Sequence, residues 1–124
     1  MKIELNHTIV NATDQRATAG FLTWVLGLPA AEDEPPFLNV HLTNDAILSV
    51  MQAGRVHAQH YAFLVGEDEF DAVFARLTER GITYFADPHQ RHPGEINHHD
   101  GGRGVYWLAP DGHVLEAITR PYGG

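Results

Sequence analysis

Hydrophobic and polar residues alternate in two segments of the chain, residues 3–10 and residues 56–65. One face of the first segment carries Ile3, Leu5, His7 and Ile9. The corresponding face of the second segment carries Val56, Ala58, His60, Ala62 and Leu64. A period of two is typical of a β-strand. Each segment is therefore predicted to be a strand with a histidine in the middle of its apolar face.

A helical pattern follows each of these strands. Apolar residues recur at positions i, i+3, i+4 and i+7 in two stripes: Phe21, Trp24, Val25 and Leu28, then Phe70, Val73, Phe74 and Leu77. Thr13 and Asp14 offer a cap for the first helix, and acidic residues 67–69 suit the start of the second. Pro29 and Gly81 are expected to end the two helices. The stripes are predicted to cover the outer faces of two sheets.

The order of elements then repeats. Strands are predicted at residues 37–43 and 46–52 after the first helix, and at residues 82–86, 105–108 and 113–119 after the second. Residues 30–36 are expected to form an acidic loop, and residues 87–102 a binding loop or lid. The repeat indicates an internal duplication. We therefore expect one α+β domain, with module one at residues 1–53 and module two at residues 54–124.

Glu116 stands out in the last predicted strand. It shares a face with Val114 and Ile118, where a carboxylate is costly to bury unless it is paired or binds a cation. His7, His60 and Glu116 therefore form a candidate metal site with two histidines and one carboxylate. Iron, manganese, zinc and nickel all suit these ligands, so the sequence leaves the identity of the divalent metal open.

Most of the other histidines are predicted to have no functional role, whereas His98, His99 and Tyr106 are candidates for one. Surface or turn positions are predicted for His41, His57, His89, His92 and His113. His98 and His99 lie in the long loop, and His99 is the candidate proton shuttle. Tyr106 is expected to be a core or cavity-lining aromatic whose hydroxyl needs a partner, and it is the candidate hydrogen-bond donor to a bound oxygen.

Composition narrows the class of ligand. The chain has 124 residues, enough for one domain with a core, and a formal net charge of −8, which argues against a nucleic-acid partner. It has no cysteine, which excludes disulfides and thiolate metal sites and fits the cytoplasm. No apolar run approaches the ~20 residues that span a membrane. We expect a cytoplasmic protein that binds a small molecule.

Three stretches together resemble the vicinal oxygen chelate superfamily. They are Leu5-Asn-His7 before a helix ending in Leu26-Gly-Leu28, His60-Tyr-Ala-Phe63, and Ala109-Pro-Asp-Gly-His-Val-Leu-Glu116. The superfamily includes glyoxalase I, extradiol dioxygenases, fosfomycin-resistance transferases and bleomycin-resistance proteins. The resemblance covers essentially the whole chain. It implies two βαβββ modules whose curved mixed sheets surround a metal-centred cavity, and its metal ligands match His7, His60 and Glu116.

Departures from each member narrow the choice. Glyoxalase I has a fourth ligand in the strand at residues 46–52, which here offers only Ser49 and Met51. Fosfomycin enzymes hold a phosphonate with a basic, hydroxyl-bearing loop, whereas Arg103 is the only cation expected near residues 97–102. Bleomycin-resistance proteins lack the metal triad. Extradiol dioxygenases add a loop histidine and a tyrosine, which His98 or His99 and Tyr106 match loosely.

The resemblance thus implies a divalent-metal-dependent enzyme whose small substrate chelates the metal through vicinal oxygens. Dioxygenase-type chemistry is expected first, and lyase or isomerase chemistry second. The alternative is a non-catalytic protein that sequesters a ligand or drug, as bleomycin-resistance proteins do. The resemblance also implies a homodimer in which modules of different chains enclose each cavity. Each metal would then be held by His7 of one chain with His60 and Glu116 of the other.

Overall fold

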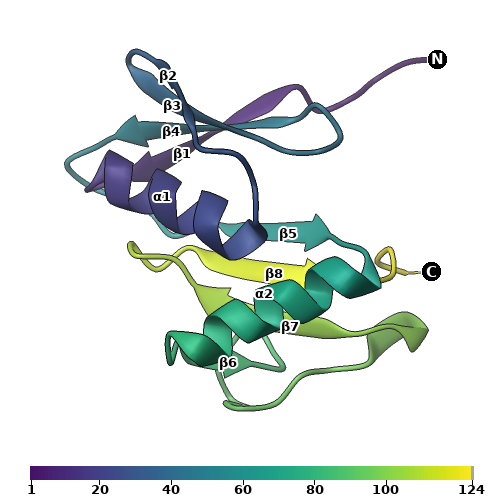
Figure 1. Cartoon of the computed structure of the whole chain (residues 1–124). Coiled ribbons are helices and arrows are strands. Elements are labelled where there is room, and N and C mark those ends of the chain that lie inside the picture. The colour runs from purple at the N-terminus through teal and green to yellow at the C-terminus, as the bar shows by residue number, and fades with distance from the viewer. Residues whose placement is uncertain (124) are drawn as a thin grey trace. The chain divides into compact units, whose positions relative to one another are not determined.

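The computed structural model describes residues 1–123, which divide into two compact units at the junction of His57 and Ala58. Each unit contains one long helix and one four-stranded mixed sheet (Figure 1). The two units share the same order of elements. The predicted α+β class with two similar βαβββ modules is therefore confirmed.

The first unit is built from one helix and four strands. These are β1 (His7–Ala12), α1 (Gln15–Leu26), β2 (Glu32–Glu34), β3 (Phe37–His41) and β4 (Ile47–Gln52). The strand order in the sheet is β1-β4-β3-β2. β1 and β4 pair in parallel, and the other pairs are antiparallel.

The second unit repeats this plan. It contains β5 (His60–Leu64), α2 (Glu67–Glu79), β6 (Tyr84–Phe85), a short 3₁₀ helix (His99–Gly101), β7 (Gly104–Leu108) and β8 (Val114–Ile118). The strand order is β5-β8-β7-β6, and β5 and β8 again pair in parallel. The first strand of each unit therefore lies beside its last.

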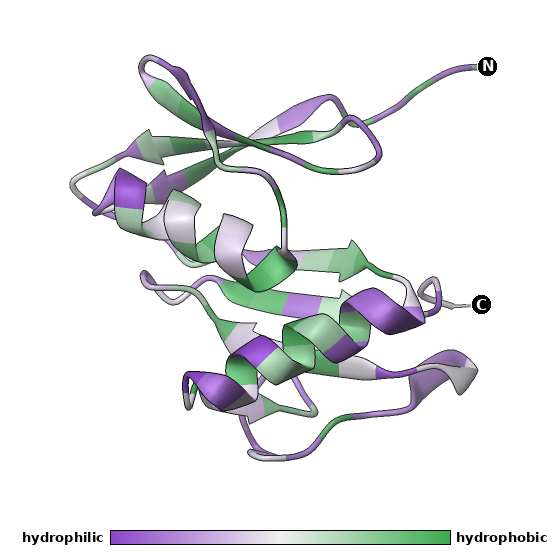
Figure 2. Ribbon diagram, viewed as in Figure 1, coloured by the Kyte–Doolittle hydropathy of each residue, from purple (hydrophilic) through white to green (hydrophobic). Residues whose placement is uncertain are grey.

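The two helices begin and end by ordinary capping. Asp14 caps α1, because its carboxylate accepts a hydrogen bond from the backbone of Ala17 at 3.1 Å. Gly27, with a φ of 69°, ends α1 two residues before the predicted stop at Pro29. α2 begins with three acidic residues and is followed by Gly81, with a φ of 64°. Figure 2 shows hydrophobic and hydrophilic residues alternating along α2, whereas α1 begins with hydrophilic residues and ends with hydrophobic ones.

The core lies on the opposite strand face from the one that carries the histidines. In β1, Val10 and Ala12 are buried, whereas His7 and Ile9 are exposed. In β5, Phe63 is buried, whereas His60 and Leu64 are exposed. Both faces of these strands carry apolar residues, so alternation alone does not decide which face the helix covers. In each sheet, the histidine lies on the face that is open in this chain.

The helix stripes are correct for α2 and shifted for α1. Phe70, Val73 and Leu77 are buried as predicted, and Phe74 is only half-buried. In α1 the buried residues are Thr18, Ala19, Leu22, Thr23 and Val25, and the predicted Phe21 and Trp24 are half-buried. The spacing 18, 22, 25 is as helical as the predicted one. The smaller side chains of that stripe face the core.

The first strand is shorter than predicted. Residues 1–6 form no strand, and Ile3 and Leu5 are 83% and 71% exposed. Pairing begins at His7 because its partner strand β4 begins opposite it, at Ile47. The acidic residues expected in a loop instead form β2, an exposed strand beside β3. No helix of the described residues is long and apolar enough to cross a membrane.

Candidate functional site

His60 and Glu116 meet on the open face of the second sheet. β5 and β8 are neighbours in register, with Ala62 opposite Glu116, so His60 and Glu116 point to the same side. His60 Nε2 lies 2.9 Å from Glu116 Oε1. The Glu116 side chain is 11% exposed and that of His60 is 46% exposed. Two of the three predicted ligands are therefore in contact.

Tyr106 completes this cluster. It lies directly opposite Glu116 in the pairing of β7 with β8, and its hydroxyl donates a hydrogen bond to the Glu116 carboxylate. Burial, this hydrogen bond and the nearby negative charge together raise the pKa of Tyr106 well above its ordinary value. Its ring centroid is 5.8 Å from that of His60. Glu116 is thus held by a partner on each neighbouring strand.

His7 occupies the matching place in the first sheet. It is the first paired residue of β1, opposite Ile47, just as His60 is the first paired residue of β5, opposite Val114. Its Nδ1 lies 2.7 Å from Asn6 Oδ1. Because an amide oxygen can only accept, Nδ1 is the donor in this contact, and Nε2 is the ring nitrogen that the contact leaves available. This arrangement is typical of a histidine that binds a metal through Nε2.

His60 and Glu116 suit a divalent cation, but a metal site needs at least one more ligand. An imidazole nitrogen and a carboxylate oxygen converge within 2.9 Å on an open face, and both suit a first-row metal. Within each unit taken by itself, as far as it is described, no group of three or more His, Cys, Asp or Glu side chains is close enough to hold a metal. The second unit therefore brings His60 and Glu116 together without a third ligand of its own among the described residues.

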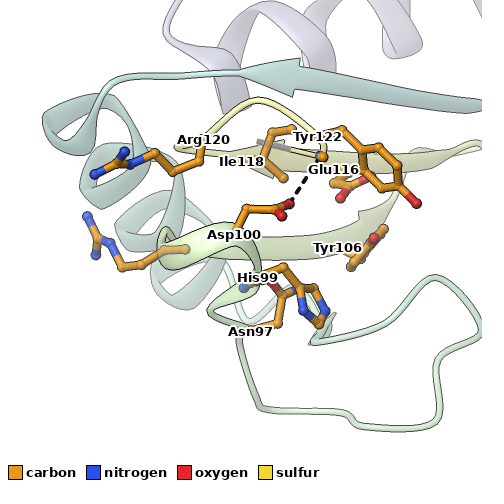
Figure 3. A pocket seen from close by; sticks show the side chains of 10 residues that line it. Asn97, His99, Asp100, Tyr106, Glu116, Ile118, Arg120 and Tyr122 are labelled. Carbon is orange, nitrogen blue, oxygen red and sulfur yellow. Dashed lines mark hydrogen bonds between the residues drawn. The ribbon is translucent and has the colours of Figure 1, made fainter.

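A cavity of about 470 Å³ opens beside Glu116 (Figure 3). Its walls come from the loop before β7, from β7 and β8, and from the end of the chain: Asn97, His99, Asp100, Arg103, Tyr106, Glu116, Ile118, Arg120, Tyr122 and Gly123. The predicted proton shuttle His99 and the predicted donor Tyr106 both line it. His98 is not one of the lining residues.

Backbone hydrogen bonds to Asp87 order the beginning of the 87–102 loop. Its carboxylate accepts from the amides of His89, Arg91 and His92 at 2.9–3.2 Å. Desolvation acts to raise the pKa of Asp87, but these hydrogen bonds outweigh it and lower the pKa below its ordinary value. The loop ends in the 3₁₀ helix that carries His99.

Arg103 lines the cavity and is paired with acidic residues of α2. Its guanidinium lies 2.8 Å from carboxylate oxygens of both Glu67 and Asp71, and 4.4 Å above the centre of the Phe70 ring. It therefore fastens β7 to the start of α2. The expectation that it is the only cation near the loop is wrong, because Arg120 also lines the cavity.

His113 was wrongly predicted to lie at the surface. It is 1% exposed, and its Nδ1 accepts a hydrogen bond from the backbone of Gln59 at 3.0 Å. Its ring meets Tyr61 edge-on at 5.6 Å. The signal was present in the sequence, since a period of two puts residue 113 on the same face as the core residues Leu115 and Ala117.

Comparison with known proteins identifies the family. The model of the Glyoxalase/Bleomycin resistance protein/Dioxygenase superfamily matches residues 4–117. The chain belongs to this superfamily, which confirms the resemblance that its motifs carry.

Three relatives give finer likenesses. The structure of oxidase ChaP-H1 is 57% identical with a TM-score of 0.96, and covers 99% of this chain and 100% of its own. Oxidase ChaP-H2 is 52% identical with a TM-score of 0.96, covering 100% and 98%. Glutathione transferase FosA from Serratia marcescens is 29% identical over an alignment of 119 residues, and the match covers 90% of this chain and 77% of that protein. The chain is thus similar both to proteins named as oxidases and to one named as a glutathione transferase.

Proposed function

We propose that this protein is a divalent-metal-dependent oxidase with dioxygenase-type chemistry, acting on a small molecule that carries two neighbouring oxygens. The observation that carries the proposal is the contact of His60 with Glu116 on an open sheet face, 2.9 Å apart and beside a cavity of about 470 Å³. The likeness to two oxidases at 57% and 52% identity supports oxidation over lyase or isomerase chemistry.

His60, Glu116 and His7 would hold the metal. When bound, the metal supplies Lewis-acid chemistry that stabilises negative charge on the two substrate oxygens. Glu116 contributes the only carboxylate of the set, and its contacts with His60 and Tyr106 keep it directed along the open face. The contact of His7 Nδ1 with Asn6 would leave Nε2 as the ligand atom of His7.

The other cavity residues would handle the substrate. The Tyr106 hydroxyl remains protonated at neutral pH, and it can donate its one proton either to Glu116 or, when substrate is bound, to a substrate oxygen. His99 lines the same cavity and has an exposed ring, so it can take a proton from the substrate and pass it to water. Ile118 adds an apolar wall.

The third ligand would come from a second copy of the chain. Neither unit supplies three ligands by itself among its described residues, and His7 lies exposed on an open face that also carries the exposed Ile9. Open apolar sheet faces and edges are usually covered in a stable protein. A homodimer in which His7 of one chain joins His60 and Glu116 of the other meets both requirements.

Metal analysis of the protein purified without a histidine tag tests the metal site. Stoichiometric divalent metal is expected in the wild type, and it should be lost in His7→Ala, His60→Ala and Glu116→Gln. The matched control is His41→Ala, an exposed histidine that pairs with Glu32 instead. Stoichiometric metal in all three ligand variants would contradict the assignment. A wild type that never takes up metal would favour the ligand-sequestering alternative.

Oxygen uptake separates the reaction classes. The metal-loaded protein should consume dissolved oxygen with a substrate from a panel of catechols and hydroxyketones, and Glu116→Gln should not. Substrate turnover without oxygen uptake would instead support a lyase or isomerase.

Mixed dimers test whether two chains share each site. His7→Ala and Glu116→Gln are unfolded, mixed in equal amounts and refolded, so that half of the dimers are mixed. A mixed dimer has one site with both lesions and one intact site, so roughly a quarter of all sites should bind metal again. If each site lies within one chain, no site is intact. Absence of recovery, with mixed dimers seen by mass spectrometry, would exclude the shared site.

A further inference from the structure

Gln59, the residue before His60, makes two hydrogen bonds at the start of β8. The carbonyl of Gln59 accepts a hydrogen bond from the backbone of Val114 at 2.8 Å, and its N–H donates to His113 Nδ1 at 3.0 Å. The first bond continues the β5–β8 ladder, but the second uses a side chain. From this arrangement we infer that His113 is a positioning residue for His60; the inference rests on the proposed metal site.

The His113 imidazole takes the place of a backbone carbonyl as the acceptor for the Gln59 N–H. The chain reaches β8 through a tight turn that ends at Gly112, with a φ of 85°. In a parallel ladder, the next backbone acceptor for the Gln59 N–H would be the carbonyl of Gly112, which belongs to this turn. On the β5 side, the ring of His113 provides the acceptor. It therefore extends the ladder by one hydrogen bond beyond the first paired residue, His60.

The first unit shows that the fold does not require the hydrogen bond between Gln59 and His113. There, Ile47 donates to the Asn6 carbonyl at 2.9 Å, as Val114 does to Gln59, and Leu42 donates to Ala46 as Ala109 does to His113. The residue that corresponds to His113 is thus Ala46, whose side chain accepts no hydrogen bond. The imidazole contact belongs to the half that contains Glu116.

The consequence for His60 follows from peptide geometry. The two bonds fix the peptide planes on either side of Gln59, and the second plane contains the N–H of His60. Residues 53–59 contain no helix or strand, so these two bonds lie directly before the first paired residue of β5. The His113 ring is itself fixed by burial and by the edge-on contact with Tyr61. His60 is thereby held where its ring meets Glu116.

Two substitutions separate the hydrogen bond from the bulk of the side chain. His113→Leu fills the space without an acceptor, and His113→Asn supplies an amide oxygen near the place of Nδ1. Co²⁺ affinity is measured by titration, and exchange of the Gln59 amide by NMR. His113→Leu should weaken Co²⁺ binding about tenfold or more, as loss of a ligand's supporting contact does, and should speed Gln59 exchange. His113→Asn should restore most of both.

Val73→Ala is the matched control, because it removes buried methyl groups from α2 without touching the start of β5. It should lower stability and leave Co²⁺ affinity and Gln59 exchange unchanged. Wild-type affinity and exchange in His113→Leu would overturn the inference, as would equal weakening of Co²⁺ binding in Val73→Ala. Failure of the wild type to bind Co²⁺ would refute the metal site alone. The exchange of Gln59 in the two His113 variants would still decide whether the contact fastens the strand.

Discussion

Asp45 and Gly112 occupy the same position in two matching turns. Each is the last of the three residues enclosed by a backbone hydrogen bond, from Leu42 to Ala46 in one unit and from Ala109 to His113 in the other, with φ values of 70° and 85°. Each donates its N–H back to the start of the turn, Asp45 to Leu42 at 3.3 Å and Gly112 to Ala109 at 2.9 Å. The left-handed conformation is therefore set by the turn, and only the second half has the residue that adopts it without strain.

Gly112→Ala should accordingly lower the free energy of unfolding by about 1–2 kcal/mol. A side chain at Gly112 meets nothing within 4 Å, so the cost would come from the backbone alone. Urea denaturation measures it. The control is Gly54→Ala, where there is equal space and no positive φ. Equal losses in the two variants would show that the turn conformation is not the cause.

Removing the Tyr106 hydroxyl should loosen the hold on Glu116. Tyr106→Phe keeps the ring beside His60 but deletes the hydrogen bond to the carboxylate. Co²⁺ affinity should fall about tenfold, as it does when a ligand loses its outer partner. Tyr122→Phe, in the same cavity but largely exposed, should leave the affinity unchanged. Isothermal titration of both variants checks this, and equal affinities would assign Tyr106 no part in holding Glu116.

The two phenylalanines of α2 should differ in their contribution to stability. Phe70 is 1% exposed beneath the Arg103 guanidinium, whereas Phe74 is half-buried and meets Tyr84 edge-on at 4.9 Å. Phe70→Ala should cost about 3–5 kcal/mol in unfolding free energy, because it leaves a cavity that the fold cannot close. Phe74→Ala should cost clearly less. Urea unfolding curves of the two variants compare them, and an equal or larger loss for Phe74→Ala would contradict the packing.

The order of the 87–102 loop should depend on the charge of Asp87. Its pKa is lowered in the folded protein, so its stabilising effect is complete above the ordinary carboxyl pKa of about 3.9 and is lost as the pH falls through the lower, folded value. The amides of Arg91 and His92 should therefore stay protected from exchange down to acid pH and lose protection in Asp87→Ala. Asp33→Ala, on the exposed strand β2, should not change them. Unchanged protection in Asp87→Ala would contradict this role.

The repeated order of elements could be predicted because each element carries its own period. Two strands with period two and two stripes with helical spacing lie entirely within short stretches of sequence. The exact ends could not be predicted in the same way. β1 begins at His7 rather than residue 3 because its partner β4 begins at Ile47, which is a property of the pair.

The candidate site shows the same division. The period of two along β5 and β8 assigned His60 and Glu116 each to one face of its strand. The structure shows that these two faces are the same face of the sheet. Which face the helix covers was not readable, because Ala62 and Leu64 on one side of β5 are as apolar as Tyr61 and Phe63 on the other. The position of His113 was predicted wrongly because the neighbouring turn residues were given more weight than its spacing from Leu115. A spacing of two residues puts both side chains on the face that packs in the core.

The parallel pairing of the first strand with the last strand in each unit has a consequence for how the chain is made. Among residues 1–123, every strand pairing joins partners from the same unit, so neither sheet needs hydrogen bonds from the other half. The first sheet can be completed as soon as Gln52 has emerged during synthesis, while the residues that carry His60 and Glu116 are still being added. The entropy lost in closing each sheet is that of one half of the chain, not the whole.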